Sequence, residues 1–218
     1  MKKENLKELS LNLPKEPGVL GRARFFNSAV LIPLIKINGE YHLLFQKRAA
    51  GIRQGGDICF PGGGFEEGID KDFKDTALRE IHEELGIEAK DIKIIGQLDT
   101  YVAPIGAIIE PFIAKIKKSV LKNMKIDKSE VEKTLLIPVS FFKNTDPLEY
   151  TLSHEIQPYR FNEKGEKEVL FPVEELGLPD TYKKPWGNKR HKIWVYKYED
   201  EVIWGITSVI INDLLEKY

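Results

Sequence analysis

The sequence predicts an α/β protein in which a mixed β-sheet is sandwiched between helices. Three features predict this class: several short apolar segments typical of strands, an amphipathic helix near the middle of the chain, and a second helix at its end. A chain of 218 residues is long enough for one full domain with a sizeable core. We therefore expect a single domain over residues 1–218, in which residues 1–24 are a polar lead-in with a short helix.

The first two predicted strands form a hairpin. Residues 29–35 and 41–46 are apolar and have the composition of strands. Asn38 and Gly39 lie between them, and both residue types tolerate the positive φ of a tight hairpin turn. Residues 47–69 follow as loops around one short strand.

The central helix is predicted over residues 72–85 from its apolar periodicity. Gly86 is expected to end it as a C-cap, and Asp70 or Asp72 to cap its start. The residues of its buried stripe are Ala77, Leu78, Ile81 and Leu85.

The second half of the chain is predicted to consist mainly of strands, with a short helix over residues 140–143. Residues 202–218 form the closing segment, with a helix over 203–217, and Trp204 is expected to fill the core at its start. The strands are expected over residues 92–98, 108–116, 134–139, 149–152, 155–161 and 192–198.

Composition excludes several functional classes. A net charge of -1 argues against electrostatic binding of nucleic acid. A charged fraction of 31% and the lack of any long apolar run argue against a membrane span. Residues 1–5 are charged and no apolar segment follows, so we expect a cytoplasmic protein without a secretory signal. The single cysteine, Cys59, is interpreted as a packed residue rather than a catalytic thiol.

Three glutamates on the central helix are the strongest functional signal. Glu80, Glu83 and Glu84 share one face, since residues three and four apart are neighbours on a helix. Such like charges destabilise a bare helix, and these stand beside a glycine-rich run over residues 62–64. We interpret them as ligands for a hard divalent cation, which prefers oxygen. Arg79 flanks this face and is expected to orient a carboxylate rather than the substrate.

The segment from Arg79 to Ile87 resembles the second half of the Nudix box: an Arg-Glu pair, a hydrophobic residue, two glutamates and a glycine at the same spacing. The first half departs from that pattern, because Lys71 stands where the family has a glutamate and Phe65 where it has a glycine. A longer loop with Asp70 in the acidic role accounts for both departures. The resemblance implies the Nudix fold and hydrolysis of a diphosphate bond with Mg²⁺ or Mn²⁺.

A second resemblance concerns the residues before the box. The segment from Leu43 to Gly63, with its Phe-Pro-Gly-Gly run, looks like the extended motif of the coenzyme A pyrophosphatase branch of the Nudix family. This resemblance implies that Lys47, Arg48 and Arg53 bind the substrate and its 3′-phosphate. Two single-residue changes in spacing lie beside this segment, so they bear on substrate identity more than on reaction type.

The expected site combines a metal, a diphosphate and a base. Its metal ligands are Glu80, Glu84, Glu83 and, as the family resemblance implies, a backbone carbonyl of the glycine run, that of Gly62 or Gly63. Backbone N–H groups of Gly63 and Gly64 can approach phosphate closely because glycine has no Cβ. The base is left open between Glu83 and Glu110, so the catalytic residues expected are Glu83, Glu80, Arg79 and Glu110.

Three functions remain open at this point. The first is hydrolysis of coenzyme A or acyl-coenzyme A to 3′,5′-ADP and 4′-phosphopantetheine. The second is a Nudix enzyme for ADP-ribose, a nucleotide sugar or an oxidised nucleoside triphosphate. The third is a nucleotide sensor without catalysis, against which the intact glutamate cluster argues. In each case the partner is a small nucleotide. A homodimer is left open, since family members are often dimers.

Overall fold

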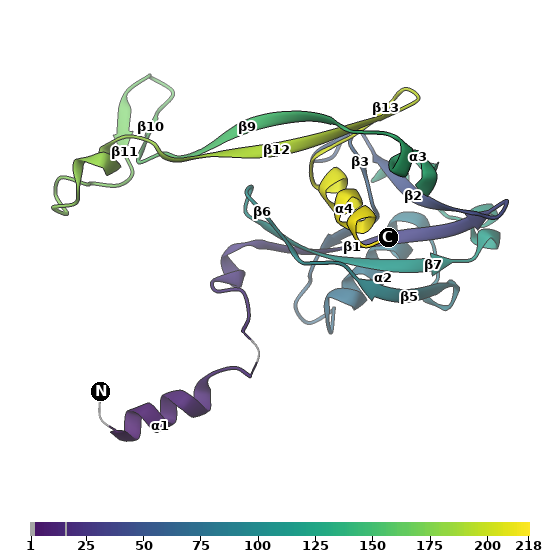
Figure 1. The fold of residues 1–218 in the computed structure, drawn as a ribbon, viewed down its shortest axis with the longest axis horizontal. Helices are drawn as coiled ribbons and strands as arrows, with labels where there is room; N and C mark the ends of the chain where they lie inside the picture. The colour runs from purple at the N-terminus through teal and green to yellow at the C-terminus, as the bar shows by residue number, and fades with distance from the viewer. Residues whose placement is uncertain (1–2, 16) are drawn as a thin grey trace.

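The computed structural model describes residues 3–15 and 17–218 (Figure 1). Its main body is an eight-stranded mixed sheet. A helix, α1 (Lys3–Asn12), and the 3-10 turn η1 (Arg22–Arg24) precede the sheet. A short helix was predicted for this lead-in. The strands of the main sheet are β1 (Phe26–Ile37), β2 (Glu40–Arg48), β3 (Ile58–Cys59), β4 (Gly62–Gly64), β5 (Ile92–Gln97), β6 (Tyr101–Ala103), β7 (Ala107–Ile116) and β8 (Val131–Pro138).

Strand β1 organises this sheet. Along one edge it pairs antiparallel with β2 through its second half and with β4 through its first half, while β7 runs parallel along the other edge. Ala29 consequently lies in register with Gly63 on one side and with Glu110 on the other. The predicted hairpin between β1 and β2 is confirmed, with φ of 50° at Asn38 and 92° at Gly39.

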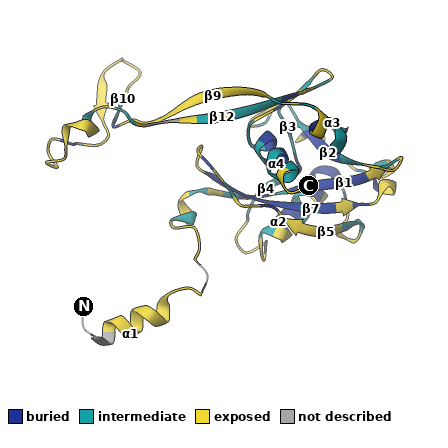
Figure 2. Ribbon diagram, in the orientation of Figure 1, coloured by how far each residue is buried: buried dark blue, intermediate teal, exposed yellow. Residues whose placement is uncertain are grey.

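The sheet lies between two helices, as the sequence predicted. Helix α2 (Phe73–Leu85) packs through Ala77, Ile81 and Leu85 against one face of the sheet. Helix α4 (Gly205–Glu216) covers the other face with Ile210 and Ile211. Figure 2 shows the buried residues concentrated where these layers meet.

The limits of α2 follow from its caps. The Asp72 carboxylate accepts a hydrogen bond from the Asp75 N–H at 2.9 Å, so Asp72 rather than Asp70 is the N-cap. Gly86 ends the helix with φ of 66°, a left-handed conformation that favours glycine. These caps fix which helical residues face the glycine strand β4.

A long arm projects from this body (Figure 1). Strands β9 (Leu148–Ile156), β12 (Trp186–Tyr198) and β13 (Glu201–Ile203) form a three-stranded sheet, and the hairpin of β10 (Tyr159–Phe161) and β11 (Lys167–Val169) lies at the distal end. The prediction of one strand over 155–161 was wrong. The strand breaks after Ile156, where Pro158 lacks the N–H that a ladder needs.

Short helices complete the structure. They are η2 (Ala89–Asp91), η3 (Lys118–Lys122), α3 (Val139–Asn144) and η4 (Asp180–Lys183). Among the residues that the structure describes, no helix combines the length and apolarity required to cross a membrane.

Trp204 does not fill the core, contrary to expectation. Its side chain lies at the surface before α4, with 44% of the residue exposed. Its indole N–H donates to the Asp57 carboxylate at 3.2 Å, because an indole donor needs a polar partner that an apolar core would not supply.

Phe45 is a central residue of the core on the α4 side. It is fully buried, and its ring stacks on Phe60 at a centroid distance of 4.6 Å and lies 5.9 Å from Phe142. We expect Phe45→Ala to lower the free energy of unfolding by about 3–5 kcal/mol, measured by urea denaturation. Phe26→Ala is the control, since Phe26 is 57% exposed. An equal loss in both variants would contradict this account of the core.

Candidate active site

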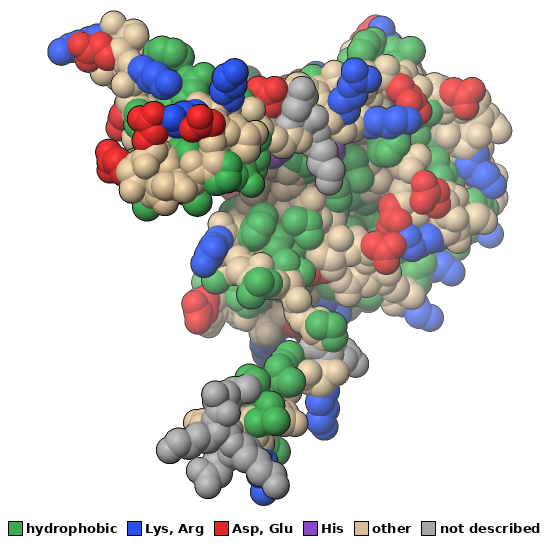
Figure 3. All heavy atoms as spheres, turned by 60° about the vertical axis from the view of Figure 1, so that its left-hand side comes forward, with side chains coloured by type: hydrophobic (Ala, Val, Ile, Leu, Met, Phe, Trp, Pro, Cys, Tyr) green, Lys and Arg blue, Asp and Glu red, His purple; other side chains and the backbone are tan. Residues whose placement is uncertain are grey.

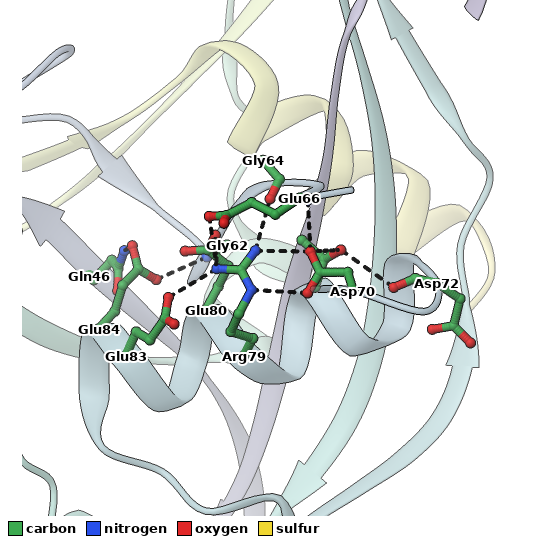
Figure 4. Close-up of polar contacts among 11 residues, drawn as sticks. Gln46, Gly62, Gly64, Glu66, Asp70, Asp72, Arg79, Glu80, Glu83 and Glu84 are labelled. Atoms are coloured by element: carbon green, nitrogen blue, oxygen red, sulfur yellow. Dashed lines mark hydrogen bonds and ion pairs between the residues drawn. The ribbon is translucent and has the colours of Figure 1, made fainter. Parts of the chain in front are cut away.

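Close backbone contacts bring the glycine strand against helix α2 and strand β1 (Figure 4). A Cβ atom added at Gly63 would lie 2.3 Å from Oε1 of Glu80, and one added at Gly62 would lie 2.3 Å from the carbonyl oxygen of Ala29. No side chain fits at such distances without displacing a neighbour. The glycines therefore allow the Glu80 carboxylate to lie directly over the β4 backbone.

Arg79 is the hub of the site. Its guanidinium donates two hydrogen bonds to the Asp70 carboxylate, at 2.9 and 3.0 Å. It donates further bonds to Glu80 at 2.8 Å, to Glu83 at 2.9 Å and to the Gly64 carbonyl at 2.9 Å. Since an arginine presents five donors in a rigid fork, one side chain fixes three carboxylates and the glycine strand together.

Asp70 binds Arg79 from the loop before α2. Its buried carboxylate also accepts bonds from the Glu66 N–H at 2.9 Å and the Thr76 hydroxyl at 3.0 Å. The hydrogen bonds from Arg79 are the main reason that the pKa of Asp70 falls to about 2. Asp70 therefore stays charged and anchors Arg79 against the start of the helix.

Glu84 has the opposite environment. It is 2% exposed, and burial raises the pKa of its carboxyl to about 8. Its oxygens accept hydrogen bonds from two neutral donors, the Gln46 amide at 2.5 Å and the Gly62 N–H at 3.0 Å. Burial also raises the pKa of Glu80. Two neighbouring carboxyls thus lack full charge compensation, a condition that favours binding of a cation.

The residues present suit Mg²⁺ or Mn²⁺ better than a cation that needs many ligands. Within residues 3–15 and 17–218, no three His, Cys, Asp or Glu side chains form a ready-made cage. Mg²⁺ takes one or two protein carboxylates and retains waters or phosphate oxygens for the rest. Glu84 and Glu80 can supply those carboxylates. Glu83 is more exposed than Glu80 and accepts a hydrogen bond from Arg79. The Gly62 carbonyl stays a predicted ligand.

The three basic residues expected to bind substrate do not lie together. Side chains alternate along β2, so Arg48 shares the α2 face with Gln46, whereas Lys47 points to the opposite face. There the Lys47 ammonium pairs with Glu201 at 3.1 Å. Arg48 instead donates to the backbone carbonyl of Arg53 at 3.1 Å, and Arg53 is exposed.

Glu110 lies apart from the glutamates of α2. Two strand spacings separate its backbone from Gly63, which is about 9.5 Å. Its buried carboxylate accepts bonds from Gln97 and Thr100, each at 2.7 Å, and pairs with Arg22. A base role for Glu110 stays a prediction, and it would require release from these three donors.

Sequence reasoning missed two residues near the cluster. Glu130, just before β8, lies close enough to Glu80 for its charge to raise the pKa of that carboxyl. Its carbonyl accepts a bond from the Ala49 N–H at 2.8 Å, which ties the turn to the end of β2. Gln46 contacts Glu84 directly. The only sequence signal for Gln46 was a polar residue directly after the apolar run from Leu43 to Phe45.

The pKa of Glu84 predicts how metal-free stability depends on pH. Because its folded value of about 8 exceeds the ordinary 4.5, the folded protein holds this proton more tightly than the unfolded chain. The stability that this proton contributes is fully present below pH 4.5 and is lost as the pH rises through 8. From pH 6 to 9, we expect Glu84 to cost about 3 kcal/mol of unfolding free energy. Thermal melts in EDTA should show this decline, and Glu84→Gln should remove it. An identical decline in both proteins would contradict the prediction.

The contact between Gly63 and Glu80 predicts the effect of a single methyl group. Gly63→Ala should push the Glu80 carboxylate off the β4 backbone and weaken Mn²⁺ binding, with little loss of folding because the displaced atoms end a flexible side chain. Isothermal titration with Mn²⁺ measures this effect. The control is Gly96→Ala, where a Cβ meets nothing within 4 Å. Wild-type Mn²⁺ affinity in Gly63→Ala would argue against this role of the glycine.

This chain is similar in sequence to known proteins. The NUDIX domain family matches residues 26–195. Nudix hydrolase 3 of Caenorhabditis elegans is 33% identical over 194 residues, which cover 87% of this chain and 72% of that protein.

Two coenzyme A diphosphatases are also similar over shorter regions. Peroxisomal coenzyme A diphosphatase NUDT7 of Mus musculus is 30% identical over 52% of this chain and 48% of its own length. Mitochondrial coenzyme A diphosphatase NUDT8 of Homo sapiens is 32% identical over 60% of this chain and 56% of its own length. The chain therefore spans about half the length of each of these two relatives. Together with the matched domain, these similarities show that the chain belongs to the Nudix hydrolase family.

Proposed function

We propose that this protein hydrolyses the diphosphate bond of coenzyme A or an acyl-coenzyme A, releasing 3′,5′-ADP and 4′-phosphopantetheine. The observation that carries this proposal is the pair of largely buried acidic side chains, Glu80 and Glu84, held against a glycine strand whose lack of side chains lets Glu80 lie over its backbone. The similarity to two coenzyme A diphosphatases supports the substrate class.

In this proposal Glu80 and Glu84 hold Mg²⁺ or Mn²⁺. The ion, when bound, neutralises phosphate charge and lowers the pKa of a water. Arg79 keeps Glu80 in place and leaves Glu84 to the cation, because its donors are already engaged by Asp70, Glu80 and Glu83. The protein thus supplies a fixed set of oxygen atoms before the substrate arrives.

The diphosphate would lie along the glycine strand. The Gly64 N–H faces away from β1 and is a candidate donor to its oxygens, whereas the N–H of Gly63 faces Ala29 in the ladder. Arg48, on the same sheet face as the glutamates, is the basic residue best placed to contact a phosphate. Arg53 is exposed near it and is the second candidate, whereas the pairing of Lys47 with Glu201 argues against a direct role for Lys47.

A carboxylate near the ion would accept the proton from the attacking water. Glu83 is bonded to Arg79, and Glu110 is held by three donors two strands away. Glu130 is exposed and lies within electrostatic reach of Glu80. We therefore rank Glu130 above Glu110 and Glu83 as the base, since a base must be free to accept a proton.

One observation favours a second candidate substrate class. With Lys47 on the other sheet face, fewer basic groups are available for a 3′-phosphate than the motif implied. A diphosphate that lacks this group, such as ADP-ribose or a nucleotide sugar, is therefore the alternative.

A substrate panel separates these candidates. We expect the purified protein with Mg²⁺ or Mn²⁺ to release 3′,5′-ADP from coenzyme A faster than AMP from ADP-ribose, as measured by chromatography of the products. Fast turnover of ADP-ribose without turnover of coenzyme A would overturn the proposed substrate. No turnover of any diphosphate would overturn catalysis itself.

A single substitution tests the role of Glu84. Glu84→Gln should reduce turnover to background while the metal-free protein at neutral pH melts at or above the wild-type temperature, because the amide is neutral in the folded and the unfolded chain and avoids the cost of protonating Glu84 on folding. Glu88→Gln, beyond the end of α2 and exposed, should keep wild-type turnover. A Glu84→Gln protein that melts far below the wild type would instead support a structural role for Glu84.

A further inference from the structure

Gln46 is a buried polar residue whose environment is incomplete. It lies in the middle of β2, is fully enclosed, and faces α2. Its neighbours along the strand on that face are Leu44, which belongs to the apolar core, and Arg48. A long amide is seldom placed in such a position unless its polar atoms have partners.

Only half of this amide has a partner. Its Nε2 donates to Oε1 of Glu84 at 2.5 Å, as Figure 4 shows. Its Oε1 is enclosed, and none of the described residues donates a hydrogen bond to it. It is the one buried side-chain oxygen or nitrogen in the described part of the chain without such a bond. Native proteins rarely leave a buried carbonyl oxygen unsatisfied, so an atom from outside the chain is expected there.

The neighbours of this oxygen indicate what that atom is. Glu84 beside it is a buried acidic side chain, and the two groups that donate hydrogen bonds to it are neutral. Arg79 is engaged by three other carboxylates. The register neighbour Cys59 carries a thiol whose pKa is raised to about 11 by burial, and a neutral thiol is a weak donor. Arg48 lies within electrostatic reach of Glu84 and Cys59. Its guanidinium donates to the Arg53 carbonyl and not to this oxygen. An amide oxygen beside an acidic side chain can accept a bond from a water of a hydrated hard cation.

We propose that Gln46 is a positioning residue of the metal site: its N–H group holds Glu84, and its free oxygen accepts a hydrogen bond from the hydration shell of the ion. This inference rests on the proposed function, because the ion is the one assigned there to Glu80 and Glu84. It extends the site to a residue of β2, outside the helix and the glycine strand. Residues that orient a metal ligand from behind typically contribute a factor of about 10–100 to metal affinity.

Titration with Mn²⁺, followed by the electron paramagnetic resonance signal of the free ion, tests this proposal without any substrate. Gln46→Met keeps the length of the side chain and removes both polar atoms. We expect it to raise the Kd for Mn²⁺ by about 10–100-fold. Gln97→Met is a matched control, since the Gln97 amide donates to Glu110 at 2.7 Å in the same way but away from the cluster. Its Kd should match that of the wild type.

A second variant separates the role of the oxygen from that of the N–H group. Gln46→Glu keeps volume and an oxygen in place but loses the donor. If the oxygen accepts a bond from the hydration shell, this variant should bind Mn²⁺ more tightly than Gln46→Met at pH 9, although it lacks the N–H that holds Glu84. If Gln46 serves only to support Glu84, it should bind as weakly as Gln46→Met. That result, or a wild-type Kd in Gln46→Met, overturns the proposal.

The same titration distinguishes this failure from failure of the proposed function. A wild-type protein that cleaves a diphosphate and binds Mn²⁺, with variants at Gln46 that bind equally well, would refute only the role of Gln46. A wild-type protein that binds no Mn²⁺ would refute the metal site and this inference together.

Discussion

The burial of an acidic group without a matching positive charge is the constraint on which this site depends. Glu84 is enclosed between α2 and the sheet, and its direct partners are neutral. The nearest strong cation on its helix, Arg79, is bound to Asp70, Glu80 and Glu83. In a low-dielectric interior, removing a charge from water is costly unless it is paired. A divalent cation would remove that cost, so the arrangement favours metal binding.

The fold supports this arrangement through its backbone rather than through flexible loops. Strand β1 pairs with β4 and β7, and this pairing fixes Gly63 opposite the buried residue Ala29. Helix α2 buries its apolar stripe on the same sheet face, so its next face must lie over the glycines. The packing that stabilises the domain therefore also positions the carboxylates.

The arm lies outside this packed region. Figure 3 shows the molecule turned so that the distal end of the arm comes forward, well apart from the lead-in.

Local patterns were enough to predict much of this structure. The helix over 72–85, its glycine cap and the Asn38–Gly39 turn depend on near neighbours in sequence, and each was predicted correctly. Contacts between residues far apart in the sequence could not be predicted from local patterns. The enclosure of Gln46 depends on β3, β8 and α2, and Glu130 reaches Glu80 only through the pairing of β8 with β2. The pairing of Lys47 with Glu201 likewise depends on strand β13, far away in sequence.

The central claim is that the acidic face of α2 binds a divalent cation. Crystals grown with Mn²⁺ and a non-hydrolysable diphosphate test it most directly, since the anomalous scattering of manganese locates the ion without assumptions about ligands. The account predicts a peak within coordination distance of the Glu80 and Glu84 carboxylates and next to the glycine strand. A peak only elsewhere, with both side chains free of metal, would contradict it.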